Sequence, residues 1–364
     1  MSGSPGADRC PNLRGTVGPG YRQVNGRDSD KASRRGVSEP ASFPQGAWVN
    51  MIETGILSVP SQPLGADPRR RHTVFAILFP GQGSQFRGMG ADVFGHYPGI
   101  TRFACDLLGY DLPARCRDNQ DDVLARTECT QPALFTVNAL HTFERERREG
   151  RPADCYLGHS LGEYNALLAA GVFDFETGLR IVAKRGELMA AASGGGMTAV
   201  LNTPVEHLLE VLGADGVEGV DVAAHNTDTQ VVIAGADGAL RAAHASLRAR
   251  GIRFAPLRVG AAFHSRAMES ARTAFEVFLR DFTFAEPSVT VISNVSALPY
   301  EGSAIPEMLS RQIVEPVRWV ESVRHLLDRD ADMEFEEIGG TSLLRMVKSI
   351  AKSSPRRILT KSGV

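Results

Sequence analysis

Short apolar runs alternate with longer amphipathic stretches from residue 73 onward. The run TVFAILF at 73–79 is bounded by a proline and a glycine, which predicts a buried strand of a parallel sheet. A second apolar run, DCYLG at 154–158, follows a stretch with helical periodicity at 130–149. Further strands are predicted at 289–293 and within EFEEIGGTSLLRMV at 334–347, the latter as the last strand and helix of the main sheet. This alternation predicts an α/β fold.

The middle of the chain has a different order of predicted strands and helices. Between 195 and 263 the pattern reads strand, helix, strand, strand, helix, strand, which is the order of a ferredoxin-like unit. The predicted strands are 198–201, 220–225, 230–235 and 254–259, and the predicted helices are 204–212 and 239–250. The sequence therefore predicts a hydrolase-like parallel-sheet core formed by 73–194 and 264–364, with a small ferredoxin-like subdomain inserted at 195–263.

The first 72 residues differ from the remainder in composition. They contain 10 Gly and 8 Pro with no sustained helical or strand period, which predicts a disordered extension. Alternatively, they are upstream sequence translated from a start earlier than the natural one, since Met51 is available as an internal start. A transit peptide fits less well, because such peptides avoid acidic residues and this segment contains six.

Composition excludes several classes of protein. Of 364 residues, 43% are hydrophobic and 23% charged, as in globular enzymes. After residue 72 the chain holds 30 Lys and Arg against 36 Asp and Glu, so we expect no nucleic-acid partner. The sequence contains no run of about 18 apolar residues, so it predicts no membrane span. The five cysteines include no CxxC pair, and no histidines cluster beside them, so we expect no metal site and a reducing, cytoplasmic setting.

The most specific local pattern is GHSLGEY at 158–164. It follows a predicted strand and precedes a helix rich in small residues, which is the context of the GxSxG nucleophile elbow. Gly158 and Gly162 allow the strand and helix backbones to approach, while Ser160 is exposed at the helix N-terminus. The pattern predicts Ser160 as a nucleophile.

Arg185 is a charge in an apolar stripe. It lies at helical spacing from Ile181 and Val182 on one side and Leu188 and Met189 on the other. The guanidinium could pair with an internal carboxylate such as Glu163, or its end could reach water. A third interpretation is a bidentate clamp for a carboxylate on the substrate.

Two histidines could serve Ser160 as a base. His264, in GAAFHSRAME, is predicted to end a strand among small residues, with Ser265 capping the helix that follows. A histidine at such a junction is more often a surface or capping residue, but a nucleophilic serine needs a base. His159 adjoins Ser160 across a sharp turn, from which it is poorly placed to face the hydroxyl. His264 is therefore the leading candidate.

Seven motifs follow one another along the chain: FPGQGSQ, TQPAL, GHSLGEY, KRGELM, HNTDTQVVIAG, AFHS and RQIVEPVRW. Taken in this order, they resemble the malonyl-CoA:acyl-carrier-protein transacylases. The resemblance runs from about Val74 to the end of the chain. Three segments, VFDFETGL, GGGM and GAAFHSRAM, resemble most the discrete acyltransferases that serve polyketide synthases lacking built-in ones.

The resemblance implies a catalytic set. Ser160 would be the acyl-accepting nucleophile and His264 its general base, while Gln312 matches the residue whose backbone carbonyl orients that histidine. The oxyanion hole would consist of the backbone N–H groups of Gln82 and Leu161.

The resemblance also implies a substrate pocket. Arg185 matches the arginine that grips the malonyl carboxylate, and Gln131 and Asn226 match further pocket positions. Phe263 matches the residue type found in relatives that take unbranched malonyl. The preference over a substrate with one extra methyl group should be incomplete. The sequence departs from the family at 339–341, where Gly-Gly-Thr replaces the usual Gly-Pro-Gly.

We therefore expect transfer of malonyl from malonyl-CoA to the phosphopantetheine thiol of an acyl carrier protein, through a seryl ester, for polyketide biosynthesis. The alternatives are a fatty-acid transacylase, a hydrolase that clears misloaded carrier proteins, and an inactive homologue that only docks them. No cofactor or metal is implied, and we expect a monomer.

Overall fold

The computed structural model describes residues 74–150, 153–192, 194–330, 332–353 and 359–361. The predictions made for residues 1–72 lie outside these described residues, as does Thr73, the first residue of the first predicted strand.

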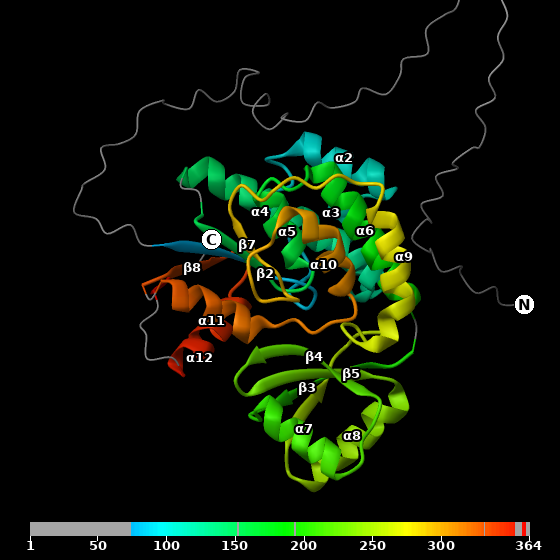
Figure 1. Cartoon of the computed structure of the whole chain (residues 1–364). Helices are drawn as coiled ribbons and strands as arrows, with labels where there is room; N and C mark the ends of the chain where they lie inside the picture. The colour runs from blue at the N-terminus through cyan, green and yellow to red at the C-terminus, as the bar shows by residue number, and fades with distance from the viewer. Residues whose placement is uncertain (1–73, 151–152, 193, 331, 354–358, 362–364) are drawn as a thin grey trace, which may run out of the picture. The chain divides into compact units, whose positions relative to one another are not determined.

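Five parallel strands form the larger sheet, in the order β7-β2-β1-β8-β9 (Figure 1). The apolar run predicted at 73–79 is β1, and all five of its side chains are buried. The prediction that 334–347 holds the last strand is wrong, because β9 follows and pairs with β8. Its three residues lack a long apolar run that would have marked them. The strand bounds are β1 Phe75–Phe79, β2 Cys155–Gly158, β7 Thr290–Ile292, β8 Glu334–Glu337 and β9 Leu359–Lys361.

Helices surround this sheet. Asp174, just before α6, accepts a 2.8 Å hydrogen bond from the N–H of Thr177 and so caps the N-terminus of this helix. The predicted helix at 130–149 begins three residues earlier, as α4, with Pro132 inside it. The helices of this part are α2 Pro98–Leu108, α3 Leu112–Asp118, η1 Gln120–Ala125, α4 Thr127–Glu149, α5 Gly162–Ala169, α6 Phe175–Ala191, η2 Arg266–Met268, α9 Glu269–Leu279, η3 Gly302–Ala304, α10 Ile305–Arg311, α11 Trp319–Arg329 and α12 Ser342–Lys352.

The second sheet is small and antiparallel, with strand order β4-β5-β3-β6. Together with its two helices it has the predicted ferredoxin-like order, so the predicted fold class is confirmed. Figure 1 shows α7 and α8 on the side of this sheet that is away from the parallel sheet. The element bounds are β3 Gly196–Leu201, α7 Val205–Ala214, β4 Val220–Thr227, β5 Gln230–Gly235, α8 Asp237–Ala249 and β6 Arg253–Pro256.

The small sheet buries both of its faces. Val200, Val231 and Ile233 pack with the apolar residues of α7 and α8 in a separate cluster. Their neighbours along the strands, such as Ala199 and Val232, belong to the main core instead. Because side chains alternate across a strand, one face serves the helices and the other faces the rest of the fold. The backbone of β4 also contacts the core, since the N–H of His225 donates to the carbonyl of Val317 at 3.0 Å.

One local prediction at the exit of this subdomain is wrong. The strand predicted at 254–259 ends at Pro256, and His264 does not end a strand. It lies in a turn with a left-handed φ of 56°, and its N–H donates to the carbonyl of Ile313 at 3.1 Å. The apolar pattern of this segment reflects burial of a turn, not of a strand. Ser265 follows in extended conformation and caps η2.

Candidate active site

Ser160 occupies a strained turn between β2 and α5. Its φ is 51°, a left-handed value that is uncommon for a residue with a side chain. A Cβ on Gly162 would lie 2.0 Å from the carbonyl oxygen of Phe79, and one on Gly158 would lie 2.0 Å from the backbone of Gly162. Both positions therefore require glycine. The turn brings the Ser160 hydroxyl to the edge of a cavity beyond the carboxyl end of the sheet.

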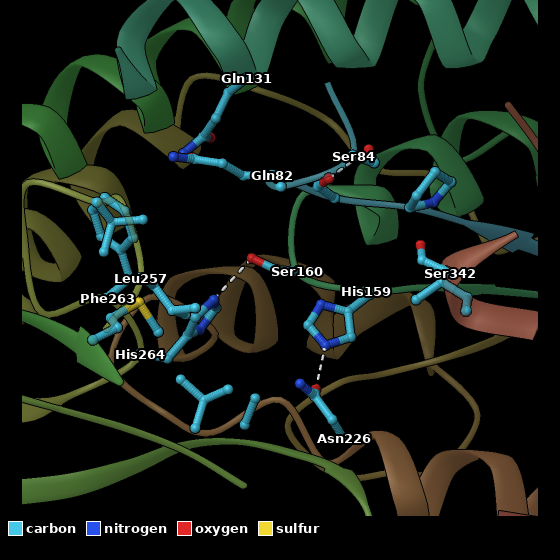
Figure 2. A pocket seen from close by; sticks show the side chains of 18 of the residues that line it. Gln82, Ser84, Gln131, His159, Ser160, Asn226, Leu257, Phe263, His264 and Ser342 are labelled. Carbon is cyan, nitrogen blue, oxygen red and sulfur yellow. Dashed lines mark hydrogen bonds between the residues drawn. The ribbon is translucent and has the colours of Figure 1, made fainter. Parts of the chain in front are cut away.

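His264 contacts the Ser160 hydroxyl directly. Its Nε2 lies 2.8 Å from Ser160 Oγ (Figure 2), and its Nδ1 lies 2.7 Å from the backbone carbonyl oxygen of Gln312. A carbonyl can only accept, so Nδ1 carries the proton and Nε2 is left to accept the serine proton. The backbone carbonyl of Glu315, at 3.2 Å, also faces Nδ1. The ring is oriented by main-chain oxygens.

Burial and a nearby cation keep this imidazole neutral. The His264 side chain is almost fully buried, and desolvation followed by the charge of Arg185 lowers its pKa to about 3. A neutral ring is the form that can accept a proton. His159, the other candidate base, points elsewhere, because its Nε2 lies 2.8 Å from Oδ1 of Asn226 (Figure 2).

Arg185 is buried to 1% exposure in α6, with its guanidinium beside the nucleophile. It donates to Oε1 of Gln131 at 2.7 Å, to Oε1 of Gln312 at 3.0 Å and to Ser160 Oγ at 3.1 Å. The guanidinium also lies over the ring of Tyr164, 5.3 Å from its centre. Every hydrogen-bond acceptor around this cation is neutral.

Two of the three interpretations of Arg185 are wrong. Its burial excludes a side chain that reaches water. Direct pairing with Glu163 is not observed, because that carboxylate bonds to Tyr300, Asn294 and Gln312. Among the residues that the structure describes, Arg185 forms hydrogen bonds to neutral side chains and no ion pair with a carboxylate, and its Nε has no hydrogen-bond partner. A buried cation in this state can bind an anionic group.

Two backbone N–H groups near Ser160 are unused. Within the described part of the chain, the amides of Gln82 and Leu161 donate to no protein acceptor. The loop that carries Gln82 packs on the elbow so closely that a Cβ on Gly81 would lie 2.3 Å from the carbonyl oxygen of His159 and 3.4 Å from the nitrogen of Leu161. Free N–H groups at such a place can stabilise an oxyanion that develops on a substrate carbonyl.

The cavity in front of Ser160 has a volume of about 270 Å³ and is lined by strands of the small sheet and by loops and helices of the core. Met197 and Val232 come from the small sheet, whereas Arg185 comes from the core. The predicted site residues that line it are Gln82, Gln131, Ser160, Arg185, Asn226, Phe263 and His264. Leu161 and Gln312 are fully buried outside the lining and face the site through backbone and amide groups.

Sequence reasoning missed Asn294. Its Oδ1 accepts the Ser160 N–H at 2.7 Å and its Nδ2 donates to the carbonyl of Gly158 at 2.7 Å, so it holds both sides of the elbow. Asn294 follows the end of β7, the strand beside β2. Polar residues just beyond the carboxyl ends of parallel strands meet at one edge, and this signal could have identified it. Ser342 and Met346 of α12 also line the cavity, without a pattern that would have indicated it.

Comparison with known proteins agrees with this geometry. Residues 76–349 match the family model described as acyl transferase domain. The chain belongs to the acyl transferase family. It is 46% identical over 281 residues to the polyketide biosynthesis protein ThaF of Burkholderia thailandensis, covering 76% of this chain and 24% of that protein. The chain thus spans about a quarter of ThaF.

Other relatives are matched along nearly their whole length. Over 290 residues the acyl transferase is 43% identical to the polyketide biosynthesis malonyl CoA-acyl carrier protein transacylase BaeC of Bacillus velezensis, covering 78% of this chain and 99% of BaeC. A crystal structure of malonyl CoA-acyl carrier protein transacylase from Burkholderia pseudomallei superposes with a TM-score of 0.76 at 43% identity, covering 78% of this chain and 99% of that one.

The described residues also bear on metal sites and membrane spans. They include no group of three His, Cys, Asp or Glu residues placed to hold a metal ion. In the same part of the acyl transferase, no helix is both long and apolar enough to span a membrane.

Proposed function

We propose that this acyl transferase moves a malonyl group from malonyl-CoA to the phosphopantetheine thiol of an acyl carrier protein, through an ester on Ser160. The observation that carries the proposal is the buried Arg185 guanidinium, 3.1 Å from Ser160 Oγ and surrounded by neutral acceptors. A thioester with a free carboxylate two bonds from its carbonyl can place that carboxylate on Arg185 while the carbonyl stays beside the nucleophile. The relatives named for malonyl transfer support this substrate.

In the first step, His264 Nε2 takes the proton of Ser160 as Oγ bonds to the thioester carbonyl carbon. The N–H groups of Gln82 and Leu161 stabilise the negative charge on the carbonyl oxygen. When the intermediate collapses, the carbon–sulfur bond breaks and the coenzyme A sulfur takes the proton from His264. The malonyl group is left as an ester on Ser160.

The second step reverses these roles. His264 takes the proton of the phosphopantetheine thiol, and the sulfur bonds to the ester carbonyl carbon. The bond to Ser160 Oγ then breaks, and Oγ recovers the proton from His264. The backbone carbonyl of Gln312 keeps the ring in one tautomer through both steps. It also accepts a hydrogen bond from Nδ1 of the transient imidazolium and so stabilises it.

Phe263 narrows the cavity beside His264, where its ring is largely buried. This supports a preference for unbranched malonyl, of about 1 to 3 kcal/mol per excluded methyl group. Relatives named for polyketide biosynthesis support that pathway over fatty-acid synthesis. We place the reaction in the cytoplasm, and the free thiols of Cys105, Cys116 and Cys155 agree with a reducing compartment.

Intact-protein mass spectrometry tests the proposal. Incubation with malonyl-CoA should add one malonyl mass to the protein. When a carrier protein bearing phosphopantetheine is added, the acyl transferase should lose this mass and the carrier protein should gain it. Ser160→Ala should show no adduct. A full adduct on that variant would refute the role of Ser160. Rapid release of free malonate without carrier protein would favour the hydrolase instead. Arg185 argues against a hydrolase of uncharged acyl groups, because such groups have no charge for this cation to bind.

A further inference from the structure

Glu163 is a fully buried carboxylate that touches neither the cavity nor the reacting atoms. It lies at the start of α5, just behind the elbow. Its Oε1 accepts hydrogen bonds from the hydroxyl of Tyr300 at 2.6 Å and the backbone N–H of Asn294 at 2.9 Å. Its Oε2 accepts from the side-chain Nε2 of Gln312. A carboxylate has only acceptors to offer, so all three neighbours must donate.

The amide of Gln312 therefore has one permitted orientation. Its Nε2 faces Glu163 and also donates to the backbone carbonyl of Ser160 at 3.0 Å, which leaves Oε1 facing Arg185 at 3.0 Å. If the amide reversed, its N–H₂ group would face the guanidinium, and two donors would oppose each other. It would also lose the bond to Ser160. The charge of Glu163 thus acts together with the Ser160 carbonyl to turn the oxygen of Gln312 toward Arg185.

We infer that Glu163 is a positioning residue for malonyl selectivity, acting through the Gln312 amide to hold the Arg185 guanidinium in place for a carboxylate. This rests on the proposed function. Glu163 is too far removed to neutralise Arg185 by direct pairing, so the cation keeps its charge for the substrate. An amide that presents oxygen steadies the guanidinium, whereas one that presents nitrogen repels it.

Glu163→Gln tests this logic because it keeps the shape of the side chain. The donors Tyr300 and Asn294 still need an acceptor, so the new amide must place its oxygen toward them and its N–H₂ toward Gln312. Nε2 of Gln312 then faces another donor, so the amide must reverse or move away, and either change disturbs its contact with Arg185. We expect kcat/KM for malonyl-CoA to fall about tenfold more than kcat/KM for acetyl-CoA, the effect of losing one hydrogen bond to a charged group.

Two control variants separate orientation from packing. Tyr300→Phe removes a hydrogen bond that lowers the pKa of the same carboxyl. At a pH high enough to keep Glu163 charged in this variant as well, the ratio of the two kcat/KM values should stay at the wild-type level. Glu336→Gln changes another buried glutamate, which pairs with Arg145 away from the cavity, and should also leave the ratio unchanged. Thermal melting of each variant records any loss of stability. The change in melting temperature should not correlate with the change in the malonyl to acetyl ratio.

Protonation gives a second test that needs no variant. Burial raises the pKa of Glu163 to about 7, and the neutral acid would donate to Gln312 as the variant amide does. The groups that face it are Arg185, Tyr300 and Tyr164, which all keep their protons between pH 6 and 8, since burial raises the pKa of both tyrosines. The malonyl to acetyl ratio of the wild type should therefore fall from pH 8 to pH 6, and Glu163→Gln should abolish this dependence.

The outcomes are distinct. A ratio that falls in Glu163→Gln alone, together with the pH dependence, supports the inference. An unchanged ratio in Glu163→Gln, an equal fall in Tyr300→Phe at the high pH, or a wild-type ratio independent of pH would overturn it. If Arg185→Ala loses malonyl preference while Glu163→Gln keeps it, only this inference fails. If the wild type does not load malonyl at all, the proposed function itself fails.

Discussion

Replacing Arg185 by alanine should change which thioester the enzyme accepts. The substitution removes a cation that is buried to 1% exposure and donates to Gln131, Gln312 and Ser160. Two opposite charges about 4 Å apart interact by about 4 kcal/mol at an effective dielectric constant of about 20. Loss of that attraction corresponds to about a thousandfold fall in kcat/KM for malonyl-CoA.

Acetyl-CoA should respond in the opposite direction. An acetyl group has no carboxylate that could lose its partner, and the proposed catalytic pair of Ser160 and His264 is unchanged. Because the charge of Arg185 lowers the pKa of His264, its removal raises that pKa and makes the ring a stronger base. The oxygens of Gln131 and Gln312 lose a donor, which costs about 1 to 3 kcal/mol of stability each, but this affects both substrates alike.

The assay is the rate of adduct formation with each thioester, measured by stopped reaction and intact mass, for the wild type and the variant. Arg185→Lys is the matched control, and should recover only part of the malonyl rate, because an ammonium group cannot form the paired contacts of a guanidinium. Equal falls in kcat/KM for both substrates would refute the reasoning, since they would make Arg185 a structural residue.

Four further predictions concern the base and the elbow. His264→Ala should slow adduct formation by about 10² to 10⁴ without changing its mass, as measured by the same assay, and an unchanged rate would exclude it as the base. Since the pKa of His264 is lowered to about 3, kcat/KM for acetyl-CoA should stay level from pH 8 to about pH 5, and a decline centred near 6.5 would contradict the buried neutral ring. For the same reason, protonation of this histidine in the unfolded chain should lower the free energy of unfolding as pH falls from about 6.5 toward 3. Gly162→Ala should destabilise the protein by about 1 to 3 kcal/mol or prevent folding, whereas Gly213→Ala, in the open face of α7, should leave the melting temperature at or above that of the wild type.

The sequence predicted local chemistry better than local conformation. Ser160 was found because GxSxG is a short-range pattern whose two glycines are needed for backbone contacts within a single turn. Arg185 was found because a charge in an apolar stripe is visible along one helix. The need of a nucleophilic serine for a base indicates His264, and the structure places its ring beside Ser160. The strand predicted to end there is wrong, since the buried turn at 261–265 has the same apolar composition as a strand end.

The parts that escaped prediction depend on distant pairs. Glu163 was considered as a partner of Arg185, but the structure places Gln312 between them, and the amide of Gln312 lies far along the chain from both. Asn294 meets Ser160 only because β7 pairs with β2. No periodicity within one segment carries such information. β9 was missed for a related reason, because three residues are too few to show alternation.

The connection of the small sheet to the core has a consequence for the order of folding. β2 must pair with β7, Cys155 opposite Thr290, across all of the intervening chain. Near the middle of that chain, Gly194 and Ala261 form an isolated β-bridge, which closes off the small antiparallel sheet at its base. Once that sheet has formed from its own local contacts, the segment that must be looped to join β2 and β7 becomes much shorter, and its closure entropy smaller. We therefore expect the inserted sheet to assemble early and to speed completion of the larger one, so that a weakened small sheet would slow folding at residues it never touches.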